Sequence, residues 1–343
     1  MLRPVKASAA IYGCLGPRLG ADEAAFFRDV RPWGFILFAR NIEGPDQVRA
    51  LVDALRQTVG REDAPVLIDQ EGGRVQRFGP PHWRRYPPAR VLARLPCGLT
   101  ARRDAVRLGA RLMADDLFAL GVNVDCAPVL DVPQPGSHDI IGDRAYGETP
   151  EAVALLGRAA AEGLLAGGVL PVIKHVPGHG RATSDSHLDL PVVEASLQAL
   201  RETDFPPFQA LSDMPLAMTA HVLYRALDPR RPATTSRRVI REVLRGELGF
   251  TGLVMSDDLS MQALQGNMSR RARQSLSAGC DVVLHCNGNM AEMKAVAAGV
   301  RDLSGRAALR AEAALARLPR RPEPFDRQEA EARFDALLSG AGS

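Results

Sequence analysis

The densest group of side chains able to do chemistry lies between residues 174 and 191. This short stretch holds three His, two Asp, one Lys and one Arg. Glycines and prolines separate these side chains, so they follow no helical repeat, and a packed core does not need such a composition. The apolar run 168–173 precedes the cluster and predicts a buried strand. The cluster therefore begins at the end of a strand and continues into a loop, where α/β enzymes hold their reactive groups.

Metal binding is one interpretation of this cluster, because several of its side chains are potential ligands. These are His175, His179, Asp185, His187 and Asp189. A zinc-binding pair on one helix is excluded for the first two histidines, since the proline and glycine between them break a helix. The first predicted strand also lacks the His-x-His pair that metal-dependent barrel hydrolases often carry. We expect neither a catalytic metal nor an organic cofactor.

Acid–base chemistry is the second interpretation. Asp185 and His187 are two residues apart, so the carboxylate could orient the imidazole, fix its tautomer and stabilise its cation. A histidine held in this way exchanges protons near neutral pH, because its unperturbed pKa is about 6.5. Asp257 ends another apolar run, and its carboxylate is suited to attack the anomeric carbon of a sugar.

The elements that must position these side chains form a regular series along the chain. Eight short apolar runs alternate with helical patterns, which implies parallel strands joined by right-handed crossovers. The expected strands are 9–13, 34–38, 65–68, 122–127, 170–173, 216–219, 253–255 and 281–285, and the clearest helices are 47–59, 102–120, 150–165 and 237–247. This pattern predicts an α/β fold with a single (β/α)8 barrel of the TIM type.

Polar residues follow the carboxyl ends of the predicted strands, which a barrel brings to one mouth. They are Asp69 to Arg74, Asp125, Asp131, Lys174, His175, His221, Asp257, Asp258 and Asn287. We expect the barrel domain to span residues 1–318. A proline- and arginine-rich run follows it, and residues 319–343 form a C-terminal extension with a terminal helix over 328–338.

Composition excludes several classes of protein. The 343 residues carry a net charge of only +3, with acidic and basic residues interleaved, so no surface for nucleic acid is expected. The five cysteines are scattered and mostly lie in apolar runs, which favours reduced thiols in the cytoplasm. No apolar run is long enough for a membrane span, and the first residues predict a strand better than a signal peptide. We expect a cytoplasmic monomer.

Taken together, these motifs resemble those of glycoside hydrolase family 3, and within it the bacterial β-N-acetylglucosaminidases of peptidoglycan recycling. The first motif reads Lys-His-x-Pro-Gly-His-Gly from residue 174, with Asp-Ser-His from residue 185 and Pro191. The others are the runs 68–77, 142–147, 218–221, 256–261 and 278–281, which occur in the family's order and cover most of the chain. The runs 82–85 and 193–194 depart from the family pattern, but neither touches the proposed catalytic residues.

The resemblance implies a retaining mechanism with Asp257 as nucleophile and with His187, polarised by Asp185, as acid/base. It implies that the non-reducing N-acetylglucosamine is bound by Asp69, Arg77, Arg144, Lys174 and His175. The substrate class would be terminal N-acetylglucosamine on muropeptides derived from peptidoglycan, a small-molecule partner. Rival functions are another β-glycosidase or a glycoside phosphorylase on the same barrel, and an inactive sugar-binding barrel.

Several of these residues have structural alternatives. Asp69 and Asp125 could cap helices after their strands, and Lys174 could pair with a carboxylate for structural reasons. Asp258 is expected to cap the following helix. His221 could lie in the sugar pocket or support it from behind, and His179 is expected to shape its loop. Cys126 and Cys280 are expected in the core.

Overall fold

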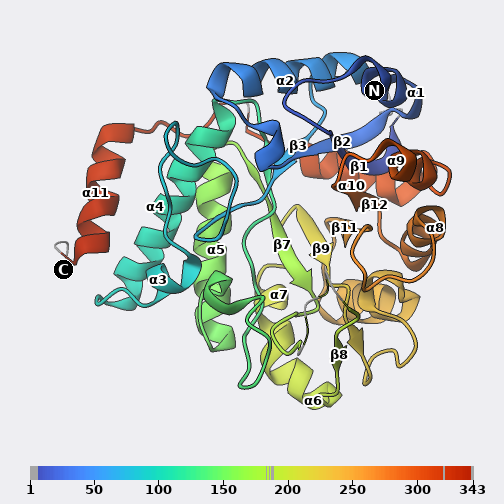
Figure 1. Ribbon diagram of the computed structural model, residues 1–343. Helices are drawn as coiled ribbons and strands as arrows, with labels where there is room; N and C mark the ends of the chain where they lie inside the picture. Colours follow the sequence, from blue (N-terminus) through green and yellow to red (C-terminus); the bar gives the residue numbers. More distant parts are fainter. Residues whose placement is uncertain (1–6, 183, 185, 187–188, 320, 341–343) are drawn as a thin grey trace.

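The computed structural model describes residues 7–182, 184, 186, 189–319 and 321–340 (Figure 1). Within these residues, eight parallel strands close a barrel in the order β1-β12-β11-β9-β7-β6-β3-β2. The strands are β1 (Ser8–Gly13), β2 (Pro32–Leu37), β3 (Val66–Ile68), β6 (Val124–Asp125), β7 (Leu170–Val176), β9 (Leu216–Thr219), β11 (Leu253–Asp258) and β12 (Val282–His285). Each overlaps one predicted run, so the (β/α)8 barrel is confirmed.

Strand lengths differ from the sequence-based expectation in ways that matter for the mouth of the barrel. β7 and β11 continue three residues further than predicted, because their ladders persist to the pairs Val176–Thr219 and Asp258–Leu284. Chemically important residues at positions 174, 175 and 257 therefore lie within strands and not in loops. β6 is shorter than expected at both ends, and just before it the side chain of Asn123 accepts the N–H of Val66 at 2.8 Å.

Helices cover the outside of the barrel (Figure 1). The main ones are α1 (Ala21–Val30), α2 (Pro45–Val59), α4 (Leu99–Phe118), α5 (Pro150–Ala166), α8 (Met268–Ala278), α9 (Met290–Ala297) and α10 (Gly305–Leu315). Shorter ones are α3 (Ala89–Ala93), α6 (Leu197–Ala199) and α7 (Phe205–Ala210). The helix expected over 237–247 is present as a π-helical segment, Val239–Glu247. None of the described helices combines length with the apolarity that a bilayer span requires.

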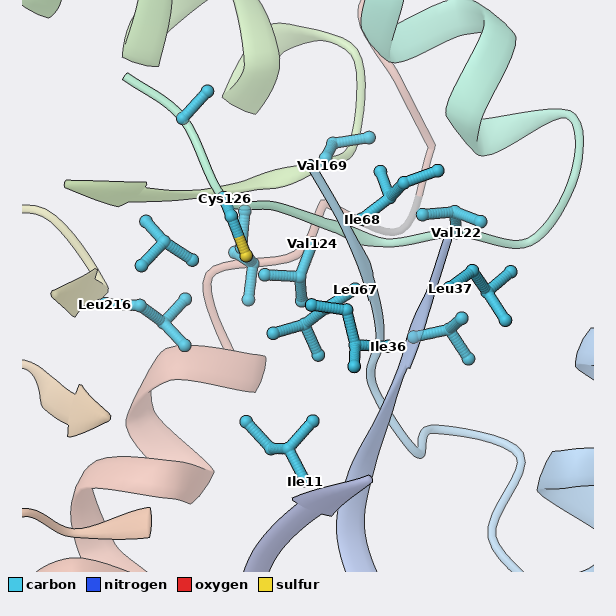
Figure 2. Packing of buried hydrophobic residues seen from close by; sticks show 14 of the residues in the cluster. Ile11, Ile36, Leu37, Leu67, Ile68, Val122, Val124, Cys126, Val169 and Leu216 are labelled. Atoms are coloured by element: carbon cyan, nitrogen blue, oxygen red, sulfur yellow. The ribbon is translucent and has the colours of Figure 1, made fainter. Parts of the chain in front are cut away.

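Apolar side chains from neighbouring strands fill the core, and Figure 2 shows part of this packing. Ile11, Leu67 and Val124 have no exposed surface, as expected for barrel strands that are covered on both faces. Cys126 and Cys280 are buried, which confirms their predicted place in the core. All five cysteines lie in the described part of the chain and are free thiols.

Two small sheets and a terminal helix complete the fold. β4 (Gln70–Gly72) and β5 (Val75–Gln76) form a hairpin directly after β3, and β8 (Val192–Val193) pairs with β10 (Leu223–Tyr224). The last helix, α11 (Arg327–Ser339), lies beside α4 (Figure 1). The ring of Phe334 packs where Gly109 has no side chain, since a Cβ there would lie 2.9 Å from the ring. The division of the chain at residue 318 stays a prediction.

Candidate active site

A pocket of about 350 Å³ opens at the carboxyl ends of the barrel strands. Six of the eight residues predicted for the site line it: Asp69, Arg77, Arg144, Lys174, His175 and Asp257. They come from β7, from β11, from the two ends of the hairpin after β3 and from the 3-10 turn Gly142–Arg144, and they are far apart in the sequence. The barrel thus brings these predicted residues to one place. The remaining two, Asp185 and His187, lie outside the described residues.

An ion-pair network forms one part of the pocket wall. Lys174 Nζ lies 3.0 Å from Asp69 Oδ1 and 2.7 Å from Glu71 Oε1. Arg144 holds Glu71 with both arms of its guanidinium, Nε at 2.7 Å and Nη2 at 2.8 Å. Arg77 Nη2 donates to Asp69 Oδ2 at 3.1 Å. Two carboxylates and three cations therefore form one connected, largely buried cluster that leaves one positive charge in excess.

In this network, ion pairing shifts the pKa values more strongly than burial does. Burial by itself would lower the pKa of Lys174, but Asp69 and Glu71 raise it well above its ordinary value. Burial would likewise raise the pKa of Glu71, yet Arg144 and Lys174 hold it well below its usual range. Lys174 and Glu71 are therefore ionised at neutral pH, and the network offers directional, charge-assisted hydrogen bonds to a polar ligand.

Glu71 is the functional residue that the sequence analysis missed. It lies in the run 68–77 directly after a barrel strand, and that position was its only signal. Neighbouring Gln70 fixes the same hairpin, because its Oε1 accepts the backbone N–H groups of Arg77 and Phe78 at 2.9 and 3.0 Å. This hairpin places Arg77 in the lining of the pocket and Glu71 behind that lining, against Lys174 and Arg144.

Asp257 lies near the end of β11 and is partly buried in the pocket wall. Its Oδ1 accepts the backbone N–H of Asp258 at 2.8 Å. Burial acts to raise the pKa of Asp257, but His221, His175 and this backbone N–H outweigh it and lower the pKa below its ordinary value. The carboxylate is therefore ionised at neutral pH, which is the state that a nucleophile requires.

His221 supports this region from behind and does not line the pocket. Its Nε2 lies 3.0 Å from the carbonyl oxygen of Asp258, which can only accept, so the proton belongs on Nε2. Its Nδ1 lies 2.7 Å from the hydroxyl of Thr234. Burial lowers the pKa of His221, and its hydrogen bond to the carbonyl of Asp258 holds the end of β11 in place.

Asp131 organises the two histidines of the 174–180 motif. Its Oδ2 lies 2.7 Å from Nδ1 of His175, and its Oδ1 accepts the backbone N–H of His179 at 2.6 Å. The buried carboxylate thus orients the His175 ring at the pocket. Burial and the neighbouring His175 lower the pKa of His179 to about 4, so this ring is neutral.

Some structural alternatives from the sequence were wrong. Asp69 and Asp125 do not cap helices: Asp69 binds two cations, while Asp125 accepts the N–H of Gln70 at 3.0 Å inside the barrel. Asp258 holds a turn through Ser260 and accepts the N–H of Cys286 at 3.2 Å. The helix after it begins only at residue 268 and is capped by Asn267, because the turn separates strand and helix. Asn287 lies outside the pocket, and its amide donates to half-buried Glu292 at 2.6 Å.

Described residues before and between positions 185 and 187 make contacts with the barrel and its surrounding segments. Before them, Arg181 Nε donates to Asp204 Oδ2 at 2.7 Å. Between them, Ser186 lines the pocket, and its carbonyl accepts the N–H of Ala263 at 3.3 Å. Among the described side chains, no group of three or more potential ligands could hold a metal ion. The expected absence of a metal stays a prediction.

A (β/α)8 barrel whose mouth gathers ionised carboxylates and fixed cations defines an enzyme that acts on a polar small molecule. The comparisons agree. Residues 18–320 match the family described as the glycosyl hydrolase family 3 N terminal domain. The chain is similar to the β-hexosaminidase of Alkalilimnicola ehrlichii, at 45% identity over 81% of this chain and 80% of the relative. It is also similar to the β-hexosaminidase of Pseudomonas aeruginosa, at 41% identity over 82% of this chain and 83% of the relative.

Two solved structures are also similar to this chain. NagZ from Neisseria gonorrhoeae in complex with N-trifluoroacetyl-D-glucosamine is 31% identical, with a TM-score of 0.84 and all of both chains covered. A family 3 β-N-acetylglucosaminidase from Paenibacillus is 30% identical, with a TM-score of 0.82 over 96% of this chain and 67% of that chain. The chain belongs to glycosyl hydrolase family 3, and it is a glycoside hydrolase.

Proposed function

We propose that the chain is a retaining exo-β-N-acetylglucosaminidase that removes terminal β-linked N-acetylglucosamine from muropeptides. The observation that carries this proposal is Asp257, an ionised carboxylate at the end of β11 in the pocket that also holds the Lys174 network. A carboxylate in this position can form a bond to an anomeric carbon while the charged network binds the sugar hydroxyls.

The proposed reaction has two steps. In the first, Asp257 attacks the anomeric carbon and the bond to the leaving oxygen breaks, while His187 donates a proton to that oxygen. In the second, His187 takes a proton from water, the water attacks the anomeric carbon, and the ester to Asp257 breaks. Net retention follows from two inversions. The roles of His187 and its partner Asp185 rest on the family resemblance, because both residues lie outside the described ranges.

Sugar recognition is assigned to Asp69, Arg77, Arg144, Lys174 and His175. Charged groups fixed by one another reject a ligand that lacks the matching polar group more strongly than apolar walls do. Two observations support an N-acetylamino sugar. The relatives named above are β-hexosaminidases, and the similar NagZ structure holds N-trifluoroacetyl-D-glucosamine. We further propose that the enzyme is cytoplasmic and monomeric, that it takes part in cell-wall recycling and that it needs no cofactor.

The test compares 4-nitrophenyl β-N-acetylglucosaminide with 4-nitrophenyl β-glucoside on the purified protein. We expect kcat/KM to favour the first by at least about 100-fold, since a site built for a hydrogen-bonding group rejects the analogue without it. NMR of the first-formed sugar should show the β-anomer. Equal kcat/KM values would promote a general β-glycosidase, and an α-anomer would refute the retaining mechanism. Release of a sugar 1-phosphate in phosphate buffer would indicate a phosphorylase, and no turnover would indicate a sugar-binding barrel.

A further inference from the structure

A second recess, of about 250 Å³, lies between the segment before residue 236 and the start of α8. Four arginines line it: Arg230, Arg231, Arg270 and Arg271. No Asp or Glu is among its described lining residues, whose other polar side chains include Thr235, Gln265 and Gln274. The recess is therefore strongly positive, and the chemistry of its wall suits an anion.

The four arginines differ in how the surrounding chain holds them, and the contacts of Arg271 and Arg270 give the recess a defined shape. Arg271 is buried, and it donates to the carbonyl oxygens of Gly266, Leu259 and Met261 at 2.9, 2.7 and 3.0 Å. It thus fixes the turn that forms one wall. Arg270 is exposed, and its stem packs over Gly266, where a Cβ would lie 2.9 Å from Arg270 Cδ.

The other two arginines lie across the recess on the segment that follows β10. Arg230 and Arg231 are both exposed, and neither forms an ion pair closer than 4 Å within the described part of the chain. Nearby Asp228 accepts the hydroxyl of Ser236 at 2.6 Å and the backbone N–H of Arg230 at 3.0 Å. The Asp228 carboxylate also interacts with the charge of Arg231, whereas the Arg230 guanidinium has no carboxylate within 4 Å among the described residues.

The recess shares a wall with the active site. Met261 lines the catalytic pocket, and Ala263 and Leu264, two and three residues later, line the recess. The N–H of Ala263 donates to the carbonyl of Ser186, which itself lines the catalytic pocket. Leu190, at the end of the same loop, lines the recess. A group bound there lies beside Leu190, which follows the proposed acid/base His187 by three residues in the sequence.

We propose that this recess binds a carboxylate carried by the aglycone of the substrate. The inference rests on the proposed function, in which His187 protonates the leaving oxygen; its sequence neighbours Ser186 and Leu190 line the catalytic pocket and the recess, respectively. Arginine forks match carboxylate geometry, and the N-terminus of α8 adds a favourable dipole. The recess would increase kcat/KM for acidic aglycones and leave neutral ones unaffected.

The experiment uses Arg230→Gln/Arg270→Gln and a matched control, Arg237→Gln/Arg273→Gln. The control removes the same charge from exposed arginines of neighbouring segments that line neither pocket. Substrates are a β-linked N-acetylglucosaminyl disaccharide with a carboxylate on its aglycone, the methyl ester of that disaccharide, and the neutral 4-nitrophenyl glycoside. Titration calorimetry with the carboxylated aglycone alone gives a readout that needs no turnover.

We expect the first variant to lose on the order of tenfold in kcat/KM for the acidic disaccharide only, with a matching loss of affinity in calorimetry. The control variant should behave as wild type on all three substrates. Equal effects of both variants, or equal losses on acid and ester, would overturn the proposal. A response of the neutral glycoside to inorganic phosphate that only the first variant abolishes would assign the recess to a free anion instead. If wild type cleaves none of the glycosides, the proposed function fails, and calorimetry still decides whether the recess binds the carboxylate.

Discussion

Glu71→Gln is the substitution that most directly tests how the pocket is held together. Glutamine keeps the size of the side chain but removes its charge and one acceptor oxygen. Arg144 then loses its two-armed partner, and Lys174 keeps only Asp69. The Lys174 and Glu71 side chains are 2% and 7% exposed, so water cannot replace the lost charge.

The size of the effect follows from that burial. Removing one partner of a buried ion pair costs about 3–5 kcal/mol, because a charge is left without compensation. Both cations keep some compensation here, so we expect a loss of about 3 kcal/mol in the free energy of unfolding. A typical domain is stable by about 5–15 kcal/mol, so the variant should fold. Arg144 is then held less firmly, and we expect kcat/KM to fall on the order of 10²-fold.

The pH dependence carries a second signature. The pKa of Glu71 is held below its ordinary value in the folded protein, so the unfolded chain binds this proton first as pH falls. The stability that Glu71 contributes is complete above about pH 5, since its unfolded pKa is about 4.3, and it is lost as pH falls through the folded pKa. The stability difference between wild type and variant should therefore be constant near neutrality and narrow below about pH 4.

Urea unfolding and steady-state kinetics measure both quantities, with Glu148→Gln as the control. Glu148 also contacts two arginines, Arg90 at 2.8 Å and Arg94 at 2.7 Å, but its side chain is 61% exposed. Such a surface group contributes about 0–1 kcal/mol. If Glu71→Gln is no more destabilising than Glu148→Gln, the reasoning from burial is wrong.

Three further outcomes are expected. Asp257→Ala should fold as wild type yet lose nearly all turnover. Added azide should restore part of the turnover and give the α-glycosyl azide as product. Near-normal activity in the absence of azide would contradict a nucleophilic role. His187→Ala should reduce kcat by about 10²–10⁴ for poor leaving groups and far less for activated phenols, and Asp185→Ala should repeat the pattern more mildly; an equal loss on both classes would indicate sugar binding. Burial raises the pKa of Asp204 to about 6 despite Arg181, so its ionisation should lower the free energy of unfolding as pH rises from 4 to 7. Asp204→Asn should remove this pH dependence of stability. If urea titrations of the variant show the same pH dependence as wild type, the assignment to Asp204 is wrong.

The architecture could be predicted because its signals are local. Barrel strands are covered on both faces, so they read as short continuous apolar runs, and all eight were found from the sequence. Parallel strands in a barrel present their carboxyl ends at one mouth, which is why Asp69, Lys174 and Asp257 were expected together and line one pocket. Strand ends were less certain, since the ladder beyond residue 173 depends on a partner strand distant in sequence.

The pairing of charges could not be predicted in this way. Glu71 and Arg144 are 73 residues apart, and the contact between them exists only because a hairpin and a helical turn converge above the barrel. Sequence spacing indicates that an acid lies near the mouth, but it does not indicate which cation the acid meets. The Arg-lined recess is similar, since two pairs of adjacent arginines in separate segments become one site only in the fold.

Asp125 and Asp257 show most clearly where the sequence stops being informative. Both follow apolar strand residues, so the sequence alone determined that each is a carboxylate at the end of a barrel strand. Burial raises the pKa of Asp125 well above its ordinary value, whereas His221, His175 and a backbone N–H outweigh burial and lower the pKa of Asp257. The surroundings therefore shift the pKa values of the two acids in opposite directions. Tertiary structure alone decided this, because the ionisation of a carboxylate depends on the charges and donors that distant segments bring within a few ångströms of it.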